Sequence, residues 1–375
     1  MTKFVQFHVL TAYPAANPNR DDQGRPKTVW MHDALRLRIS SQALKRALRE
    51  SSAFKTTLKG HLGQRTKRMG LELEKLALDL GADEDQALEV ATQVASVWGK
   101  IAAPEEGKRQ EPIVSALAFI SPDEEAAMRE WVKKAIAGEN LPSRSKLADS
   151  ILNTVDGAVD IAMFGRFLAG EKRDSDNDRL NILKFGRDGA VQVSHPFTTH
   201  AARVEDDYYT AVDDMRDTNE SQGAAMTGDM QFGSGVYYTY ACVNVDQLIS
   251  NLNGDEELAA KGLEALTEAL ATASPSGKMN SFAHHPRAAF MRVTVGEQQP
   301  CNMAQAFSSP VQGEILKNSI RNFDKMYASM SSVYGDMCDD MKDIDILKAP
   351  STSSLQDLKA FSAGAATMTK EMVDG

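Results

Sequence analysis

Cysteine is scarce in this 375-residue sequence: only Cys242, Cys301 and Cys338 are present, far apart and odd in number. Such a set provides neither a disulfide framework nor a zinc site, and it fits a reducing compartment. Long hydrophobic runs are also absent, and the first residues hold no uninterrupted apolar stretch. We therefore expect a cytoplasmic protein with no membrane span and no secretory signal. The 42% of hydrophobic residues still allows a packed core.

Motifs of common enzymes are missing as well. There is no Walker A loop, no G-x-G-x-x-G after a strand, no G-x-S-x-G elbow and no H-E-x-x-H helix. The histidines include no i, i+4 pair, and His284-His285 comes without a third ligand, so we predict no metal site, no cofactor and no catalytic residue. Asp21-Asp22 and Asp213-Asp214 could each hold Mg²⁺ against a phosphate, although adjacent Asp residues more commonly form turns.

Acidic residues are rare at one end of the chain. The net charge is −10, yet residues 1–70 hold 14 Lys and Arg against 4 Asp and Glu, while the rest of the chain holds 28 against 48. The basic segment can bind a polyanion, and the acidic remainder limits unspecific adhesion.

The most informative stretch in the basic segment runs from Arg38 to Glu50 (R-I-S-S-Q-A-L-K-R-A-L-R-E). Ser40 or Ser41 is a good N-cap, so the pattern predicts a helix. One face of that helix is apolar, and the opposite face carries Gln42, Lys45, Arg46 and Arg49. These cations and the amides of the helix start fit a phosphate-lined partner. Two alternatives stay open: a solvated surface helix, and a helix that binds an acidic protein.

The remaining pattern predicts an α+β, ferredoxin-like (RRM-like) fold with a large helical insertion. Strands are expected at Lys3–Leu10, Leu35–Ile39, Ala190–Ser194, Phe232–Val245 and Ala288–Val295. Helices are expected at Leu71–Leu80, Glu84–Lys100, Pro122–Ala137, Ser145–Ile161, Leu258–Thr272 and Val311–Tyr334. Thr11–Trp30 reads as a long polar loop and His200–Gln231 as an excursion from the sheet. Residues 336–375 read as a tail with one short helix.

Several motifs occur together in a specific order. They are Asn19–Asp22, Arg38–Ala47, Val159–Arg166, Thr198–His200, Thr210–Asp214, Ser234–Tyr238 and Asn302–Phe307. In this combination the chain closely resembles the CasC-type backbone subunit of the type I-E CRISPR Cascade surveillance complex. The resemblance implies a hand-shaped protein with a palm (1–58, 181–199 and 232–335), helical fingers (59–180), a thumb (200–231) and a C-terminal tail (336–375).

The resemblance also implies which residues bind RNA. The family's guide-contacting positions fall on Arg20, Lys27, Ser40, Gln42, Lys45 and Arg49. The motifs add Arg38, Arg46, Arg166, Phe167, Tyr209 and Thr210. Three positions depart from the family: Phe167 stands where methionine is usual, Tyr209 where phenylalanine is common, and Met279 where glutamine is common. The first two keep an apolar or aromatic surface, and the third puts a polar contact at 279 in doubt.

The function implied by the resemblance is physical and not catalytic. Copies of the subunit would polymerise along one CRISPR RNA, hold its phosphates, and kink it at regular intervals so that it pairs with a target DNA strand in antiviral defence. The implied partners are the CRISPR RNA, the target DNA, further copies of the chain and other Cascade subunits, with no membrane. One alternative is a metal-dependent nuclease subunit of the type III kind that cuts target RNA with Asp21 or Asp22. For Tyr208-Tyr209, stacking on bases and anchoring the loop on its own sheet are both open.

Overall fold

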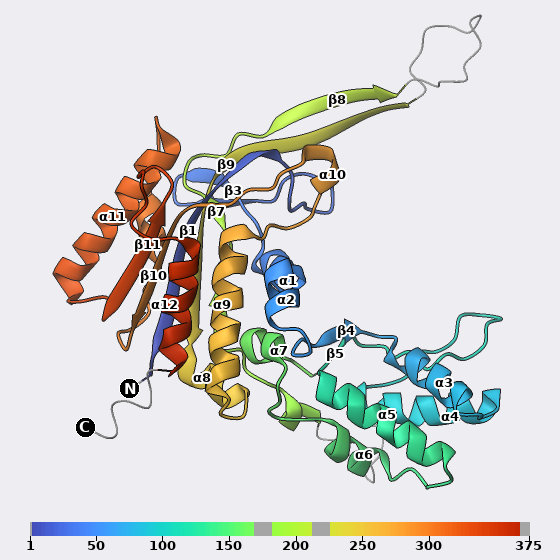
Figure 1. The fold of residues 1–375 in the computed structure, drawn as a ribbon. Coiled ribbons are helices and arrows are strands. Elements are labelled where there is room, and N and C mark those ends of the chain that lie inside the picture. The colour runs from blue at the N-terminus through green and yellow to red at the C-terminus, as the bar shows by residue number, and fades with distance from the viewer. Residues whose placement is uncertain (1, 169–181, 212–225, 368–375) are drawn as a thin grey trace, which may run out of the picture. The chain divides into compact units, whose positions relative to one another are not determined.

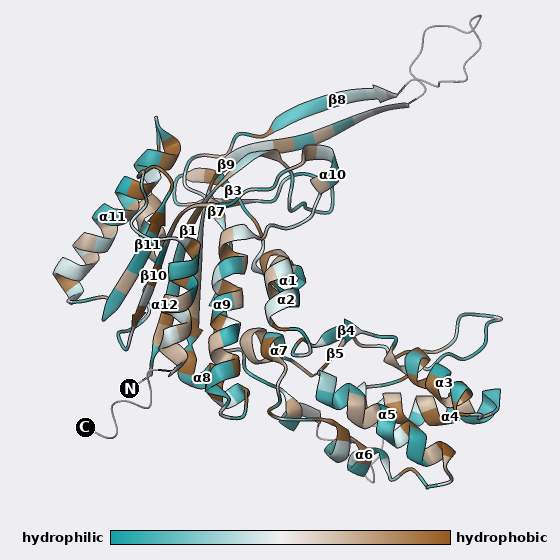
Figure 2. Ribbon diagram, in the orientation of Figure 1, coloured by the Kyte–Doolittle hydropathy of each residue, from teal (hydrophilic) through white to brown (hydrophobic). Residues whose placement is uncertain are grey.

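The computed structural model describes residues 2–168, 182–211 and 226–367, and the chain forms two compact units. The first, here called the sheet unit, comprises residues 1–57, 192–244 and 260–375. The second, here called the helical unit, comprises residues 58–191 and 245–259. Figure 1 shows the elements of both, and Figure 2 shows their hydropathy.

The sheet unit is built on a central antiparallel sheet whose strands follow the order β11-β10-β1-β9-β6. Their bounds are β1 Phe4–Ala16, β6 Val191–Val193, β9 Met226–Asn244, β10 Ala288–Gly296 and β11 Asp340–Asp345. Two further strands, β7 (Phe197–Thr198) and β8 (Glu205–Ala211), pair with β9, and β2 (Thr28–Met31) forms a hairpin with β3 (Ala34–Leu37). The α+β class and its antiparallel sheet confirm the coarse prediction.

Helices cover both faces of this sheet (Figure 1). The long helix α11 (Ile315–Tyr334) packs Phe323 and Tyr327 onto Phe290 and Tyr238 of one face. On the other face α12 (Leu355–Thr367) contacts β10 and β11, and a buried 2.7 Å hydrogen bond between the hydroxyls of Thr267 and Ser362 joins it to α9. The other helices are α1 Ser41–Glu50, α2 Ser52–Thr57, α9 Glu256–Thr272, α10 Met279–Phe282 and the 3₁₀ turn Met303–Phe307.

The helical unit has its own core, built from Leu73, Ala91, Met128, Val132 and Leu147 among others. Figure 2 shows brown, hydrophobic residues interspersed with hydrophilic ones along its helices. Its elements are α3 Met69–Asp79, α4 Glu84–Ala95, α5 Pro122–Ile136, α6 Arg144–Ile151, α7 Val159–Phe164, α8 Val245–Asn251, the strand pair β4 Gln64–Thr66 and β5 Ala118–Ile120, and the 3₁₀ turns Ser96–Trp98 and Ile182–Phe185.

Several predicted boundaries are wrong. The first strand does not end at Leu10, because Thr11 to Ala16 keep pairing with residues 233–237 of β9, so the polar loop is much shorter than Thr11–Trp30. The single helix predicted over Ser145–Ile161 is two helices, since Asp156 accepts a hydrogen bond from the Ala158 amide and forms a turn between them. The tail contains β11, and α11 begins only at Ile315, after Gly313 at φ 75°.

Other predictions agree with the structure. The strands at Lys3–Leu10, Leu35–Ile39, Ala190–Ser194, Phe232–Val245 and Ala288–Val295 all exist, with shifted ends, and so do the first three insertion helices. The excursion at His200–Gln231 contains β8, which pairs with the outer part of β9. The pair Asp213-Asp214 lies outside the described residues.

Candidate nucleic-acid interface

The basic helix α1 begins where its sequence predicts. Ser40 has extended backbone angles, and its hydroxyl accepts a 3.2 Å hydrogen bond from the Ala43 amide, so Ser40 and not Ser41 is the N-cap. Leu44 and Leu48 are buried, whereas Gln42 is exposed. The helix is therefore fixed by its apolar stripe, and its polar face does not contribute to the core.

The preceding loop is tied to the start of α1 by one side-chain hydrogen bond and two backbone hydrogen bonds. The Asn19 side chain accepts a 2.8 Å bond from the Ser40 amide, and the Asn19 carbonyl accepts one of 3.0 Å from the Lys27 amide. The Lys27 carbonyl in turn accepts a 2.7 Å bond from the Arg38 amide. Lys27 and Arg38, eleven positions apart in the sequence, are therefore held side by side at the helix start.

Arg38 is oriented by a histidine that sequence reasoning did not select. Its guanidinium lies 2.9 Å from Nδ1 of His195, and the Ser41 amide donates to the same nitrogen at 3.3 Å. Burial and then the charge of Arg38 lower the pKa of His195, so the imidazole is neutral and Nδ1 accepts. No local pattern signals this partner, because it lies on a distant segment of the chain.

The other cations differ in their surroundings. Arg46 donates a 2.8 Å hydrogen bond to Glu50 on the exposed side of α1, so its charge is partly balanced. Lys45 and Arg49 are half-buried. Arg20 is half-buried too, and its Nη1 is enclosed without a hydrogen-bond partner among the described residues.

Tyr209 and Thr210 stand on the β8–β9 hairpin, which belongs to the sheet unit. Tyr209 faces Gly228 of the paired strand, and a Cβ on that glycine would lie only 2.5 Å from the tyrosine oxygen. The ring therefore lies directly over the glycine, as a larger residue would not permit. Thr210 is exposed opposite Thr227, and Tyr208 is 69% exposed.

The structure brings the loop and the hairpin together around one cavity of about 670 Å³. The buried Asn17 makes this possible, because its side-chain amide donates to the Gln231 carbonyl of β9 at 2.8 Å and to the Gly24 carbonyl at 3.0 Å. The cavity places the predicted residues Arg20 and Tyr209 beside two cations that the sequence analysis did not select. Those two are Arg25 and Lys278, and Asp229 is also in the lining.

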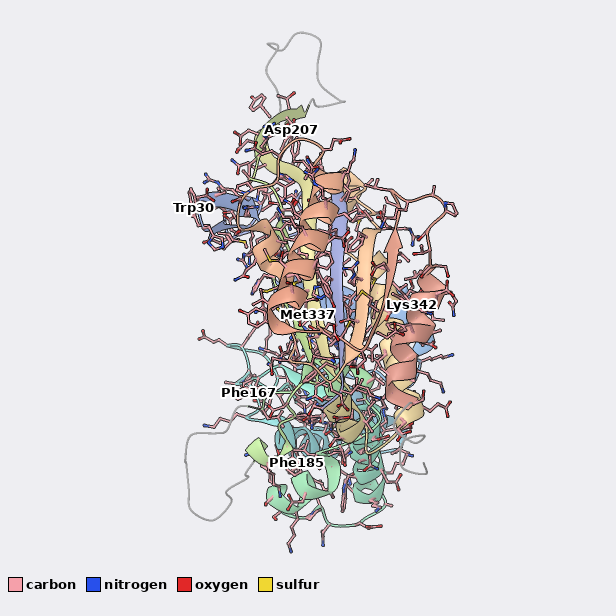
Figure 3. The ribbon with its side chains drawn as sticks, turned by 90° about the vertical axis from the view of Figure 1, so that its left-hand side faces the viewer. Trp30, Phe167, Phe185, Asp207, Met337 and Lys342 are labelled. Carbon is pink, nitrogen blue, oxygen red and sulfur yellow. The ribbon has the colours of Figure 1, made fainter. Side chains whose placement is uncertain are left out.

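Arg166 and Phe167 lie in the helical unit and have opposite environments. Gly165, at φ 78°, ends α7, and a side chain there would strike the Arg187 carbonyl at 2.9 Å. The Arg166 and Arg187 backbones then exchange hydrogen bonds of 2.8 and 2.9 Å. This pairing turns the Phe167 side chain outward, where it is 87% exposed (Figure 3).

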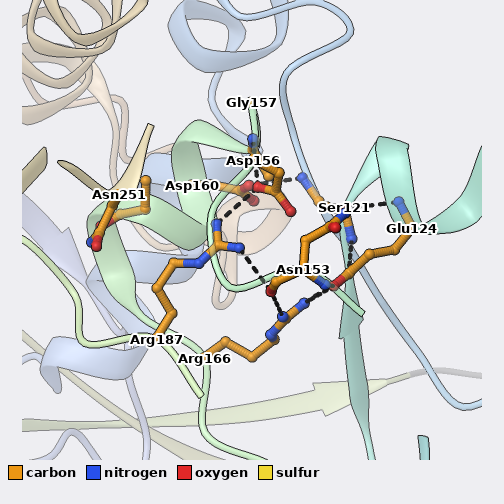
Figure 4. A network of polar contacts seen from close by, with 12 residues as sticks. Ser121, Glu124, Asn153, Asp156, Gly157, Asp160, Arg166, Arg187 and Asn251 are labelled. Carbon is orange, nitrogen blue, oxygen red and sulfur yellow. Dashed lines mark hydrogen bonds and ion pairs between the residues drawn. The ribbon is translucent and has the colours of Figure 1, made fainter. Parts of the chain in front are cut away.

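The Arg166 side chain turns inward into a buried polar network (Figure 4). Its Nη1 donates to both carboxylate oxygens of Glu124, at 2.8 and 2.7 Å, and its Nη2 donates to the Asn153 carbonyl at 2.9 Å. Glu124 also closes a capping box with Ser121 at the start of α5. Arg166 is therefore enclosed, and the side chain that this segment presents to a ligand is Phe167.

A second arginine completes the network. Nη1 of Arg187 donates to Asp156 at 2.8 Å, and both side chains are buried. Burial of Asp156 opposes ionisation, but the hydrogen bond and charge of Arg187 outweigh it, so the pKa of this carboxyl lies below its usual range. Two buried ion pairs thus hold the short segment that displays Phe167.

The Asp21 carboxylate is used by the loop itself. It accepts 2.9 Å hydrogen bonds from the Gln23 and Arg25 amides, which is a turn-forming arrangement. Across residues 2–168, 182–211 and 226–367, no three His, Cys, Asp or Glu side chains gather in a way that could hold a metal ion. The helices of the described chain include none that is both long and apolar enough to cross a membrane.

Comparison with known proteins gives this geometry a context. One solved structure, titled "CRISPR RNA-guided surveillance complex, pre-nicking", contains a chain that is 29% identical over 96% of this chain and 100% of its own, with a TM-score of 0.79. A second, titled "CRISPR RNA-guided surveillance complex", contains one that is 25% identical over 97% and 99%, with a TM-score of 0.68. A search of curated protein sequences gives no match. The sequence pattern of the CT1975-like proteins matches residues 5–373, and the chain therefore belongs to the CT1975-like protein family.

Proposed function

We propose that this chain is a backbone subunit of a Cascade-type, CRISPR RNA-guided surveillance complex, and that it holds the guide RNA by its phosphates. The observation that carries the proposal is the tie between Lys27, Arg38 and the Ser40 cap, which sets cations from a loop and from a helix start along one surface. The amides of a helix start and flanking cations suit phosphate oxygens. The two similar chains lend support, because the titles of both structures name a CRISPR RNA-guided surveillance complex.

We further propose that the sheet unit is a ferredoxin-like palm. Within its sheet, β10-β1-β9-β6 is the neighbour order, and α1 and α9 follow β1 and β9 in the chain. This gives the sequence β1-α1-β6-β9-α9-β10, a split β-α-β repeat. In this proposal residues 59–180 are the fingers and 200–231 the thumb, and the tail 336–375 contributes β11 to the palm sheet.

The division of labour in the proposal follows from side-chain chemistry. One set of side chains is proposed to contact the sugar-phosphate backbone of the RNA: Arg20, Lys27, Arg38, Gln42, Lys45, Arg46 and Arg49. Because this backbone is the same whatever the bases are, every guide sequence is accepted. Phe167 and the Tyr209–Thr210 pair of the thumb press on the strand and kink it, while Ser40 and Arg166 act by positioning their neighbours. Specificity is left to pairing between guide and target DNA. Copies associate head to tail along the RNA, and other Cascade subunits limit the array.

The subunit is proposed to be non-catalytic. A type III-like nuclease would need Asp21 or Asp22 to hold a metal ion or a water molecule at the scissile phosphate. Asp21 instead accepts two amide hydrogen bonds of its own turn, and this argues for a structural role.

Extraction of nucleic acid from the purified protein tests the proposed function. We expect RNA of one length class that carries many different spacer sequences, protected from nuclease in regularly spaced segments. Protein free of RNA, or RNA of a single sequence, would contradict the proposal. Incubation with complementary RNA and Mg²⁺ tests the nuclease alternative, which periodic cuts would restore.

A further inference from the structure

The cavity of about 670 Å³ beside Tyr209 is lined by three cations, and only one of them, Arg20, belongs to the predicted set of RNA-binding residues. The other two are Arg25 of the loop and Lys278, which precedes α10, and both are exposed. Among the described residues none of the three forms an ion pair with a carboxylate, although Asp229 is also in the lining. Like charges that gather without a counter-charge repel one another, so the cavity favours an anion as its occupant.

The guanidinium of Arg20 needs such an occupant. Its Nη1 is enclosed and has no hydrogen-bond partner among the described residues. A charged donor that is removed from water without an acceptor is costly, and a planar guanidinium suits the oxygens of a phosphate. The Arg20 backbone is fixed by its bridge to Pro26, so this side chain projects from a braced segment. An anion oxygen at the guanidinium would supply the missing acceptor.

Lys278 is held at the cavity by an uncommon backbone conformation. Its φ is 55°, in the left-handed region that residues with a side chain rarely adopt. The preceding Gly277 approaches the loop so closely that a Cβ on this glycine would overlap the Pro18 carbonyl oxygen. The segment of Lys278 is therefore packed on the same loop that carries Arg20 and Arg25. Strained positions of this kind occur mostly at functional sites.

Arg25 is positioned by the turn of its own loop. The Asp21 carboxylate accepts a 2.9 Å hydrogen bond from the Arg25 amide, and the Arg25 carbonyl accepts one of 2.9 Å from the Asp21 amide. The side-chain amide of Asn17 then joins the loop, at Gly24, to β9, at Gln231. Two segments that are far apart in the sequence thus bring their cations to one cavity on a rigid frame, as a preorganised binding site requires.

We infer that Arg25 and Lys278 are further RNA-binding residues, which together with Arg20 hold one phosphate of the bound strand in this cavity. The inference rests on the proposed function and adds two residues to the predicted set. A phosphodiester carries a negative charge and free oxygens that accept hydrogen bonds, so it matches cations that come from different segments. Contact with a phosphate reads no base, so the two residues add affinity without sequence preference.

The salt dependence of binding tests the two residues together in the full-length protein freed of RNA. The variant is Arg25→Ala combined with Lys278→Gly, because glycine accepts a φ of 55° without strain. The probes are single-stranded oligouridylate and inorganic polyphosphate, a polyanion that has no bases. With oligouridylate, the log–log salt slope should flatten by about 1.4, since each phosphate contact to a single strand contributes about 0.7. Binding of polyphosphate should weaken as well.

Two further variants serve as controls. Arg321→Ala combined with Lys325→Ala removes one arginine and one lysine from exposed positions of α11, and it should keep the parent slope. Arg25→Lys combined with Lys278→Arg keeps both charges at the cavity and should also keep that slope. Equal flattening in the α11 variant would show that only total charge matters, and this would overturn the inference.

Asp229 provides an independent readout. Asp229→Asn removes the negative charge from the lining and should tighten oligouridylate binding about two- to fivefold, the scale of one exposed charge–charge interaction. Weaker binding would mean that Asp229 is the counter-charge of the cavity, and it would overturn the inference. A parent slope in the variant of Arg25 and Lys278, or a loss confined to oligouridylate, would overturn it too, while RNA binding by the parent protein, and with it the proposed function, stands. Failure of the parent protein to bind any RNA would overturn both.

Discussion

Arg166 and Glu124 form an ion pair inside the helical unit, in which one nitrogen, Nη1 of Arg166, lies 2.8 Å from one carboxylate oxygen of Glu124 and 2.7 Å from the other. Both side chains are almost fully removed from solvent. Each of them also satisfies backbone groups, since Glu124 accepts from the Asn153 amide and Arg166 donates to the Asn153 carbonyl. The ion pair therefore connects α5 to the segment that carries Phe167.

Loss of one partner should destabilise the helical unit strongly. Arg166→Met leaves the Glu124 charge buried and unpaired, which typically costs about 3–5 kcal/mol. Urea unfolding followed by circular dichroism measures this change in the free energy of unfolding. The matched control is Lys184→Ala, which breaks the half-exposed pair with Asp149 and should cost no more than about 1 kcal/mol. Equal effects of the two variants would refute the role of the buried pair.

The variant Phe167→Ala is expected to change the conformation of the bound guide RNA without changing the stability of the protein. Because the side chain is 87% exposed, its removal should change the free energy of unfolding by no more than about 0.5 kcal/mol. If Phe167 kinks the guide, chemical probing of bound RNA should lose its regular pattern of reactive bases, while phosphate binding is kept. Leu117→Ala, also at an exposed apolar position of the helical unit, is the control and should leave the pattern intact.

The polar face of α1 is tested by removal of charge. Lys45→Ala combined with Arg49→Ala should weaken binding of all guide sequences alike and flatten the salt dependence by about 1.4 in the log–log slope, since each phosphate contact to a single strand contributes about 0.7. Filter binding across a series of salt concentrations measures both. Lys317→Ala on α11 removes a surface cation elsewhere and should leave the slope unchanged. An unaltered slope in the double variant would count against phosphate binding by α1.

Asp21 is expected to shape the loop and not to cleave RNA. Asp21→Asn keeps a side-chain acceptor for the Gln23 and Arg25 amides and should bind RNA as the parent does, whereas Asp21→Ala removes that acceptor and should weaken binding several-fold. Gel electrophoresis of complementary target RNA incubated with Mg²⁺ reports cleavage. Cuts by the parent protein that vanish in Asp21→Asn would show instead that the carboxylate is catalytic.

His8 should make the sheet unit less stable in acid. Burial, and then the charge of Arg292, lower the pKa of His8 to about 3, and its Nδ1 lies 2.9 Å from the Tyr238 hydroxyl. The unfolded chain takes up a proton near pH 6.5 and the folded chain does not, so stability is present above that pH and is lost as the pH falls. Between about pH 7 and about pH 4 this proton uptake lowers the free energy of unfolding by roughly 3 kcal/mol. In urea unfolding, His8→Gln should lack this share of the pH dependence, and the exposed control His61→Gln should retain it.

Local sequence signals predicted the elements that depend on local chemistry. The Ser40 cap and the Leu44 and Leu48 stripe each act within one or two turns, so their patterns are readable in a short window. The strand β11 could not be found in this way, because four of the six residues of Asp340–Asp345 are charged and the segment becomes a strand by pairing its backbone with β10.

The candidate site shows the same division. The cations on α1 can be recognised in the sequence as a helical pattern. His195, which contacts Arg38, and Lys278, which lines the same cavity as Tyr209, come from distant segments of the chain. Arg166 illustrates the converse limit. Its motif marks the right segment, yet only the three-dimensional position of Glu124 decides that the arginine turns inward and the phenylalanine outward.

The outer strand β11 has a consequence for how copies of the chain can associate. It carries exposed charges at Asp340 and Lys342, and such side chains on an edge strand oppose pairing with another sheet. At the other end of the same sheet order, β6 is only three residues long. Neither strand is a good template for joining sheets of two molecules. Neighbouring copies would then meet through side chains and through the bound RNA, and the length of an array would be set by the transcript and the other Cascade subunits, and not by pairing between sheets.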